Sequence, residues 1–286
     1  MSKLITVKND KIAITISTLG AEIQTVFANG RDYLWNGDEK FWSGRAPVLF
    51  PICGGLKEDK YTFGGSEYTL NKHGFAKLME FEVEAQGDGY AVFLLKSTPE
   101  TKKNYPFDFE LRIKYALDGD SVHVEYEVDN KSETDMYFSI GAHEAYACPE
   151  GIEEYHLKFE RPEHLTHNEL HGNLLSDEVT VIAENTDTLA LNYEYFKVDA
   201  ITMLNLKSRS IKLEKNDGTR TVHVDFDGFD YVFVWTRPGA GYICIEPWCG
   251  VPDFEGSSYD ITEKRGINKL PSGETFRRIH TFTIEK

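Results

Sequence analysis

The sequence lacks a long hydrophobic run. No window approaches the roughly 20 apolar residues of a membrane-spanning helix. The first residues, MSKLITVKND, have no apolar stretch of the kind found in a signal peptide and move directly into strand-like alternation. These two absences predict a cytoplasmic protein that does not enter a membrane.

Cysteine is also scarce. The chain of 286 residues has 4 cysteines and no CxxC pair. All of them lie in apolar or glycine-rich surroundings: Cys53, Cys148, Cys244 and Cys249. We interpret them as free thiols, which are typical of a protein in a reducing compartment.

Basic residues are outnumbered by acidic ones. Lys and Arg total 31 against 47 Asp and Glu, so the formal net charge is −16. This excess argues against nucleic acid as a partner, because nucleic-acid binders carry basic faces. It also gives no help in attracting phosphorylated molecules. A small neutral molecule is the expected partner, and the composition leaves both a monomer and a homodimer open.

The chain does have strand-like alternation along most of its length. Apolar and polar residues alternate in SVHVEYEV, and hairpin turns are expected at Asp118-Gly119-Asp120 and Asp217-Gly218. Helical periodicity is nearly absent, apart from short turns in PETKKNYP and LNYEYFK. With 41% hydrophobic residues, the sequence predicts one all-β domain over residues 1–286, folded as a large antiparallel β-sandwich.

Two distant segments each deliver one ionisable side chain from an apolar strand. SIGAHEAY carries His143, and GYICIEPWCG carries Glu246. An imidazole and a carboxylate that converge would form an acid/base pair. The alternatives are a buried histidine bonded to a backbone carbonyl, and a structural ion pair between Glu246 and Arg237 or Arg45.

Four further residues are candidates for holding a ligand or assisting the pair. LNKHGFA places His73 between a hairpin and the next strand, and Trp248 offers a flat surface of the kind that stacks on sugar rings. Arg45 is suited to anchor a hydroxyl group or to neutralise a buried carboxylate. Asp199, in FKVDAI, either accepts hydroxyl hydrogens from a polyol or forms a turn.

One histidine pattern has the spacing of a metal site. His164, His167 and His171 would share one face of a helix. Pro162, Gly172 and the weak apolar periodicity favour a solvated loop instead, so we predict no metal site here.

Taken in order, these segments resemble the aldose 1-epimerase (mutarotase) family, in its shorter bacterial mutarotase-like branch. The resemblance runs from LGAEIQTVFANG and GRAPVLFPICGG through LNKHGFA, SIGAHEAY and FKVDAI to YICIEPWCGVPDF. It implies a β-supersandwich fold and the interconversion of α and β anomers of a free aldose without a cofactor. One position departs from the family pattern, because Glu144 stands where members of this branch usually have proline.

The resemblance also implies roles for individual residues. His143 matches the general acid, Glu246 the general base, and His73 a second imidazole near the ring oxygen of the sugar. Arg45 and Asp199 match the residues that hold the sugar hydroxyls. We expect residues 143 and 246 to face each other across a hollow, about one pyranose ring apart.

Two rival functions are compatible with the same resemblance. A hexose-6-phosphate 1-epimerase would need a cluster of arginines for the phosphate, and beyond Arg45 the sequence has no obvious one. A carbohydrate-binding or sugar-sensing protein would retain the pocket without turnover.

Overall fold

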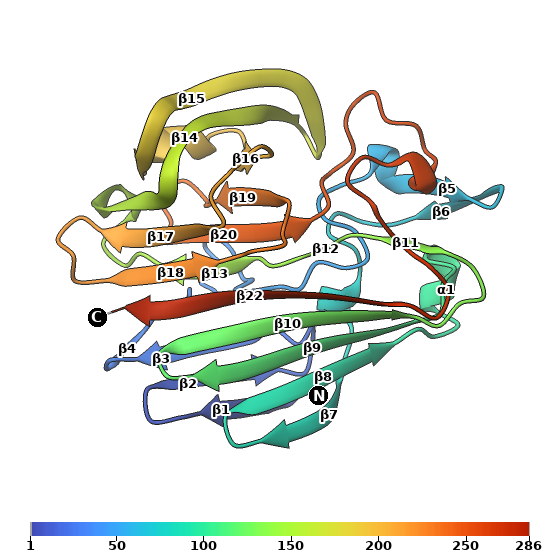
Figure 1. Ribbon diagram of the computed structural model, residues 1–286, viewed down its shortest axis with the longest axis horizontal. Helices are drawn as coiled ribbons and strands as arrows, with labels where there is room; N and C mark the ends of the chain where they lie inside the picture. The colour runs from blue at the N-terminus through green and yellow to red at the C-terminus, as the bar shows by residue number, and fades with distance from the viewer. Residues whose placement is uncertain (1, 286) are drawn as a thin grey trace.

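Two packed layers of antiparallel strands make up the computed structural model, which describes residues 2–285 (Figure 1). One layer is a sheet of nine strands. In spatial order they are β15 (Leu174–Ala190), β14 (Tyr155–His171), β17 (Ser210–Lys215), β18 (Thr221–Asp225), β22 (Thr275–Glu285), β10 (Ser121–Asn130), β9 (Phe109–Asp118), β8 (Tyr90–Lys96) and β7 (Glu82–Gly87). The predicted all-β sandwich is confirmed.

The second layer consists of two smaller sheets. One has the order β12 (Ile140–Gly141), β20 (Tyr242–Cys249), β19 (Tyr231–Trp235) and β16 (Ile201–Met203), and β13 (Glu144–Ala147) also pairs with β20. The other runs β1 (Leu4–Lys8), β2 (Ile12–Ser17), β3 (Ile23–Ala28) and β4 (Arg31–Asp32). Contacts such as Tyr146 with Phe282 join the layers, with ring centroids 5.8 Å apart.

The remaining elements are short. Two strand pairs flank the layers, namely β5 (Lys60–Phe63) with β6 (Ser66–Thr69) and β11 (Met136–Phe138) with β21 (Asn268–Leu270). The helical turns are η1 (Lys57–Asp59), η2 (Ala76–Leu78), α1 (Thr101–Asn104), η3 (Ile152–Glu154), η4 (Tyr193–Phe196) and η5 (Ile261–Glu263). Within residues 2–285, no helix has the length and apolar character needed to cross a membrane.

The alternation of the sequence explains which faces are buried. In β10 the apolar residues of SVHVEYEV point into the sandwich and the polar ones outward, so buried and partly exposed positions alternate. Both predicted hairpins are present, since Asp118 pairs with Ser121 and Glu214 pairs with Thr221 around their turns. Strand β20 is buried along its entire length, as its nearly continuous apolar sequence predicts.

The solvated loop predicted around the three clustered histidines is wrong. His164, His167 and His171 lie on β14, which forms a long hairpin with β15 that curls over the top of Figure 1. The pairing tolerates Pro162 because the register shifts between Lys158 and Glu163. Because successive side chains of a strand alternate between its faces, the helical spacing expected for a metal site does not apply.

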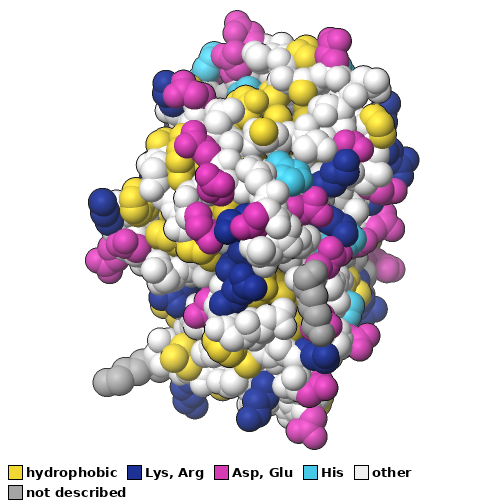
Figure 2. All heavy atoms as spheres, turned by 90° about the vertical axis from the view of Figure 1, so that its left-hand side faces the viewer, with side chains coloured by type: hydrophobic (Ala, Val, Ile, Leu, Met, Phe, Trp, Pro, Cys, Tyr) yellow, Lys and Arg dark blue, Asp and Glu magenta, His cyan; other side chains and the backbone are white. Residues whose placement is uncertain are grey.

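The surface of the molecule is densely charged. On the face that Figure 2 shows, acidic and basic side chains are interspersed over the ends of the sheets. On the outer face of the large sheet, for example, Arg112 contacts Glu84, Glu110 and Asp129 at 2.8–3.0 Å.

Candidate active site

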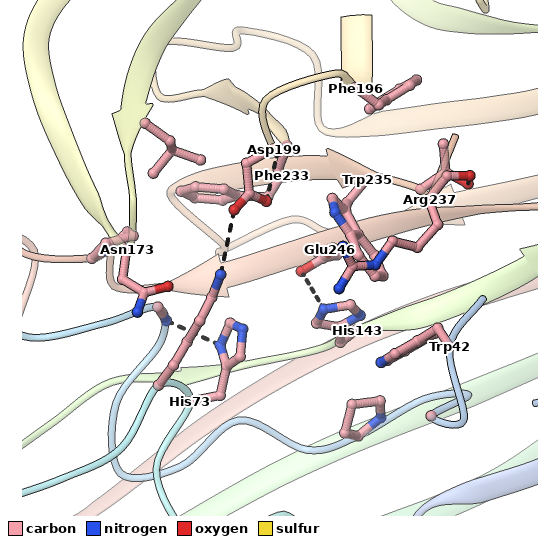
Figure 3. A pocket seen from close by; sticks show the side chains of 18 of the residues that line it. Trp42, His73, His143, Asn173, Phe196, Asp199, Phe233, Trp235, Arg237 and Glu246 are labelled. Carbon is pink, nitrogen blue, oxygen red and sulfur yellow. Dashed lines mark hydrogen bonds and ion pairs between the residues drawn. The ribbon is translucent and has the colours of Figure 1, made fainter. Parts of the chain in front are cut away.

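A cavity of about 550 Å³ opens beside the five-stranded sheet (Figure 3). Its lining comes from β19 and β20 and from loops that are far apart in the sequence. The lining side chains that bear on the chemistry are Trp42, Lys72, His73, Lys77, His143, Asn173, Asp199, Phe233, Trp235, Arg237, Glu246 and Trp248. A concave site with aromatic walls and a few polar groups is typical of a small-molecule pocket.

His143 and Glu246 meet at the base of this cavity. His143 Nε2 lies 3.3 Å from Glu246 Oε2, and Figure 3 shows the two side chains pointing toward each other. Their exposed fractions are only 8% and 2%. The predicted pair is therefore present, but the two groups are in contact and are not separated by the width of a sugar ring.

Strand pairing explains this contact. Both β12 and β13 pair with β20, so that Gly141 lies opposite Trp248 and Glu144 opposite Ile245. His143, between the two short strands, is therefore held beside Glu246. A Cβ atom on Gly141 would lie 2.4 Å from the indole of Trp248, so only glycine permits this close approach.

Burial sets the proton affinities of the pair. Removal from water raises the pKa of Glu246 well above its usual value, and the nearby Lys72 ammonium only partly opposes this. The same removal from water lowers the pKa of His143 to about 3. Both shifts favour uncharged forms, so we expect the contacting groups to titrate as one coupled unit.

His73 is the second imidazole at the site. Its ring centroid lies 5.6 Å from that of His143, and its Nδ1 accepts a hydrogen bond from the Gly54 amide at 3.1 Å. A neutral ring bonded in this way carries its proton on Nε2. Burial lowers the pKa of His73 well below its usual value, so the ring stays neutral and presents an N–H donor.

Asp199 lines the cavity on the side opposite His73. Its carboxylate forms an ion pair with Lys72 Nζ at 3.5 Å, and the Asp199 side chain is 25% exposed (Figure 3). A carboxylate and an ammonium placed together offer both acceptors and donors to a polyol. The sequence identified Asp199 but not its partner Lys72.

Trp248 lines the cavity, but its ring is largely occupied. It stacks on Phe233 with centroids 3.9 Å apart, and its Nε1 donates to the Ala142 carbonyl at 3.0 Å. With 3% of its surface exposed, Trp248 fixes the wall of the site and offers little free face. Trp42 and Trp235 also line the cavity, and the sequence analysis missed both.

Arg45 lies apart from this group, which is a correction to the expected site. Its guanidinium donates to the backbone carbonyls of Gln24 and Asn36 at 2.7 and 2.5 Å, and Arg45 does not line the cavity. These bonds tie the loop that carries Arg45 to β3 and to the loop at Asn36. The cavity is instead lined by Arg237, which the sequence analysis had considered only as an ion-pair partner of Glu246. The ionic partner that Glu246 has in the structure is His143.

One set of side chains has the spacing of a metal site. A ring nitrogen of His143, the thiol of Cys244 and a carboxylate oxygen of Glu246 lie within 4.8 Å of one another. A thiol must lose its proton to bind a metal. Burial raises the pKa of Cys244 well above its usual value, so this set fits a metal poorly.

Comparison with known proteins places the chain in a family. Residues 3–259 match the family model described as aldose 1-epimerase. The plasmid protein LacX of Lactococcus lactis subsp. lactis is 33% identical over 98% of this chain and 99% of its own length.

Two solved structures are similar over almost their whole length. A galactose mutarotase related enzyme from Lactobacillus acidophilus has a TM-score of 0.93 and 32% identity, with 99% of this chain and 98% of that chain covered. A galactose mutarotase-like protein from Lactobacillus casei has a TM-score of 0.94 and 27% identity, with 99% and 100% covered. The chain belongs to the aldose 1-epimerase family.

Proposed function

We propose that the protein interconverts the α and β anomers of a free aldose, such as a hexose, by opening and reclosing its hemiacetal ring without a cofactor. The observation that carries this proposal is the 3.3 Å contact between His143 and Glu246 at the base of a sugar-sized cavity. Opening the hemiacetal ring requires one proton acceptor and one proton donor near the same carbon atom.

The reaction has a simple balance of protons and bonds. The O1 proton leaves, the C1–O5 bond breaks, and O5 gains a proton. We assign Glu246 as the base at O1 and His143 as the acid at O5, with His73 as a donor close to the ring oxygen. Because O1 and O5 are bonded to the same carbon, an acid and a base in contact with each other can serve both atoms.

The pair needs only one transferable proton, in addition to the N–H proton that a neutral imidazole keeps. When that proton is on His143, Glu246 can accept the O1 proton while His143 protonates O5. After opening, the proton is on Glu246, and ring closure runs through the reverse transfers. Both states contain the same number of protons, so no external acid or base is consumed, and each group contributes about 10²–10⁴-fold.

The rest of the cavity suits an uncharged sugar. The aromatic wall that includes Trp42 and Trp235 can pack against the apolar face of a pyranose, and the Asp199–Lys72 pair can bond its hydroxyls. The open-chain aldehyde must turn about its C1–C2 bond before reclosure, and a cavity of about 550 Å³ leaves room for this rotation.

The charges at the cavity favour a free sugar over a phosphorylated one. Lys72 is paired with Asp199, Lys197 is paired with Glu194 at 2.5 Å, and Lys77 Nζ donates to the Lys72 carbonyl at 3.1 Å. Within residues 2–285, Arg237 is the single arginine that lines the cavity. A phosphate site is typically built from several convergent donors of this kind.

The test is a polarimetric screen of freshly dissolved α-glucose, α-galactose and their 6-phosphates. We expect the wild-type protein to accelerate the anomerisation of at least one free aldose. We expect Glu246→Gln to lose about 10²-fold or more in rate while its circular dichroism is unchanged.

Glu163→Gln is the matched control. Glu163 is a buried glutamate, 3% exposed, that bonds to Ser208 outside the cavity, so the variant should keep its turnover. Wild-type protein that bound a sugar without accelerating its anomerisation would point to a sugar-sensing role. Full activity in Glu246→Gln would remove Glu246 from the role of base.

A further inference from the structure

A second buried acid–base pair lies directly behind the first. His280 Nε2 is 3.1 Å from Glu144 Oε1, and the side chains are 0% and 4% exposed. Glu144 follows His143 in the chain, and His280 lies on β22 of the nine-stranded sheet. The pair therefore bridges the two layers of the sandwich, and the proposed chemistry does not use it.

Burying this pair is costly. Glu144 Oε2 and His280 Nδ1 have no hydrogen-bond partner among the described residues. Unpartnered buried polar atoms destabilise a fold, and apolar side chains of similar volume often replace a buried ion pair without loss. Packing alone gives no reason for this pair, which suggests that its polarity serves the neighbouring site.

The geometry supplies such a reason. The side chains of these two neighbouring residues point in different directions, since His143 lines the cavity and Glu144 bonds to His280 of the large sheet. A hydrogen bond that holds Glu144 toward the large sheet therefore helps to keep His143 directed toward the cavity. Glu144 also lies opposite Ile245 in the ladder, one residue from Glu246, so both members of the proposed catalytic pair adjoin this bridge.

We propose that Glu144 and His280 are positioning residues, which hold His143 against Glu246 and place a negative charge behind Glu246. The inference rests on the proposed function for its effect on turnover. Neither residue lines the cavity.

The electrostatic surroundings support this inference. After burial and Asp199, the Glu144 carboxylate is a further cause that raises the pKa of Glu246, while Lys72 lowers it. The other titratable groups whose pKa values the Glu144 carboxylate affects are Tyr115, Tyr126, Tyr146 and Cys244. Burial raises the pKa values of Tyr115, Tyr126, Tyr146 and Cys244.

Aromatic rings enclose His280. The Tyr126 ring stacks on the His280 ring with centroids 5.7 Å apart, and Phe229 covers another side of His280.

The first test is Glu144→Gln, which keeps an oxygen to accept the His280 hydrogen bond but removes the charge. A lost negative charge weakens proton binding by the His143–Glu246 pair. We expect both limbs of the kcat/KM–pH profile to move to lower pH by about half a unit or more. Glu163→Gln removes a buried carboxylate elsewhere and should leave the profile unchanged.

The second test is the double variant Glu144→Met/His280→Phe, which leaves no buried charge unpaired and should therefore fold. We expect kcat to fall about tenfold or more, with KM within about twofold, because His143 loses its anchor. A folded double variant with wild-type kcat and pH profile would overturn the inference.

A third measurement does not depend on turnover. The carboxyl carbon of Glu246 can be followed by NMR during a pH titration of wild type and Glu144→Gln. A lower titration midpoint in the variant supports the inference, and an identical midpoint overturns it. If the wild-type protein accelerates no aldose, the proposed function fails, while this titration still decides the role of Glu144.

Discussion

At the scale of single residues, the site combines two groups that burial pushes in opposite directions. His143 binds its proton more weakly in the folded protein, with a pKa lowered from 6.5 to about 3. Glu246 binds its proton more tightly than the usual value of 4.5. Both shifts couple folding to pH, because a group with different pKa values in the folded and unfolded states makes stability pH-dependent.

For His143 the pKa in the folded protein is lower than in the unfolded chain, so the unfolding free energy rises with pH between the two values. Its contribution to stability is present above about pH 6.5 and is lost as the pH falls toward about 3. Over this pH window, we expect the unfolding free energy of His143→Gln to fall by a few kcal/mol less than that of the wild type. Urea titrations at several pH values measure the difference. Parallel curves for wild type and variant would contradict the shift.

For Glu246 the pKa is raised in the folded protein, so the dependence of stability on pH has the opposite direction. Stability is present below the unfolded value of 4.5 and is lost as the pH rises through the higher folded value. Glu246→Gln should therefore unfold at a higher temperature than wild type near neutral pH, with the gain disappearing below about pH 4.5. Scanning calorimetry at both pH values checks this. A variant that is less stable than wild type at neutral pH would argue that the carboxyl contributes net stabilising contacts.

At the scale of elements, one tight turn carries His73 into the cavity. His73 and Gly74 have φ values of 69° and 65°, a conformation that favours glycine. The His73 amide donates to the Gly54 carbonyl at 2.8 Å, and a Cβ on Gly74 would lie 2.3 Å from the Phe50 carbonyl oxygen. The position of the imidazole therefore depends on close backbone contact at Gly74.

Gly74→Ala tests this dependence. Strain at positive φ and the clash with Phe50 should together cost about 3 kcal/mol or more of unfolding free energy. Anomerisation should slow about tenfold or more, because His73 is displaced. Gly218→Ala is the control, since Gly218 has a φ of 73° with open space around it. The control should lose only about 1 kcal/mol and keep its activity. Equal effects of the two substitutions would show that the turn does not position the site.

At the scale of the whole molecule, the sandwich buries every cysteine. All four are free, and they lie in the clusters between and beside the sheets: Cys53, Cys148, Cys244 and Cys249. Burial raises the pKa of each thiol, to about 12 for Cys249. Their reactivity therefore reports on opening of the fold, because the thiolate is the reactive form.

We expect the native protein to resist labelling by a thiol-specific disulfide reagent such as Ellman's reagent, and all four thiols to react in concentrated urea. The readout is the absorbance of the released thiolate, with and without denaturant. Cys249→Ser is a suitable control, and its unfolded form should release one thiolate equivalent fewer. Fast reaction of any native thiol would show that its sheet opens locally.

The sequence alone determined the fold class and identified several of the side chains that line the cavity. Period-two alternation, as in β10, specifies which side chains face a core, and short turns such as Asp118-Gly119-Asp120 specify neighbouring strands. His143, Glu246, His73 and Asp199 stand in recognisable local segments, and all of them line the cavity. Such features are local, so they can be recognised in the sequence without knowledge of tertiary contacts.

Only the tertiary structure decided which groups meet. The register between β13 and β20 joins residues about 100 positions apart and brings His143 into contact with Glu246, while the packing of the two layers brings Glu144 to His280. Non-local contacts also bind the Arg45 side chain to the Gln24 carbonyl, outside the cavity, and pair Lys72 with Asp199. Local periodicity carries no information about such pairings, because it specifies the face of a strand and not the partner opposite it.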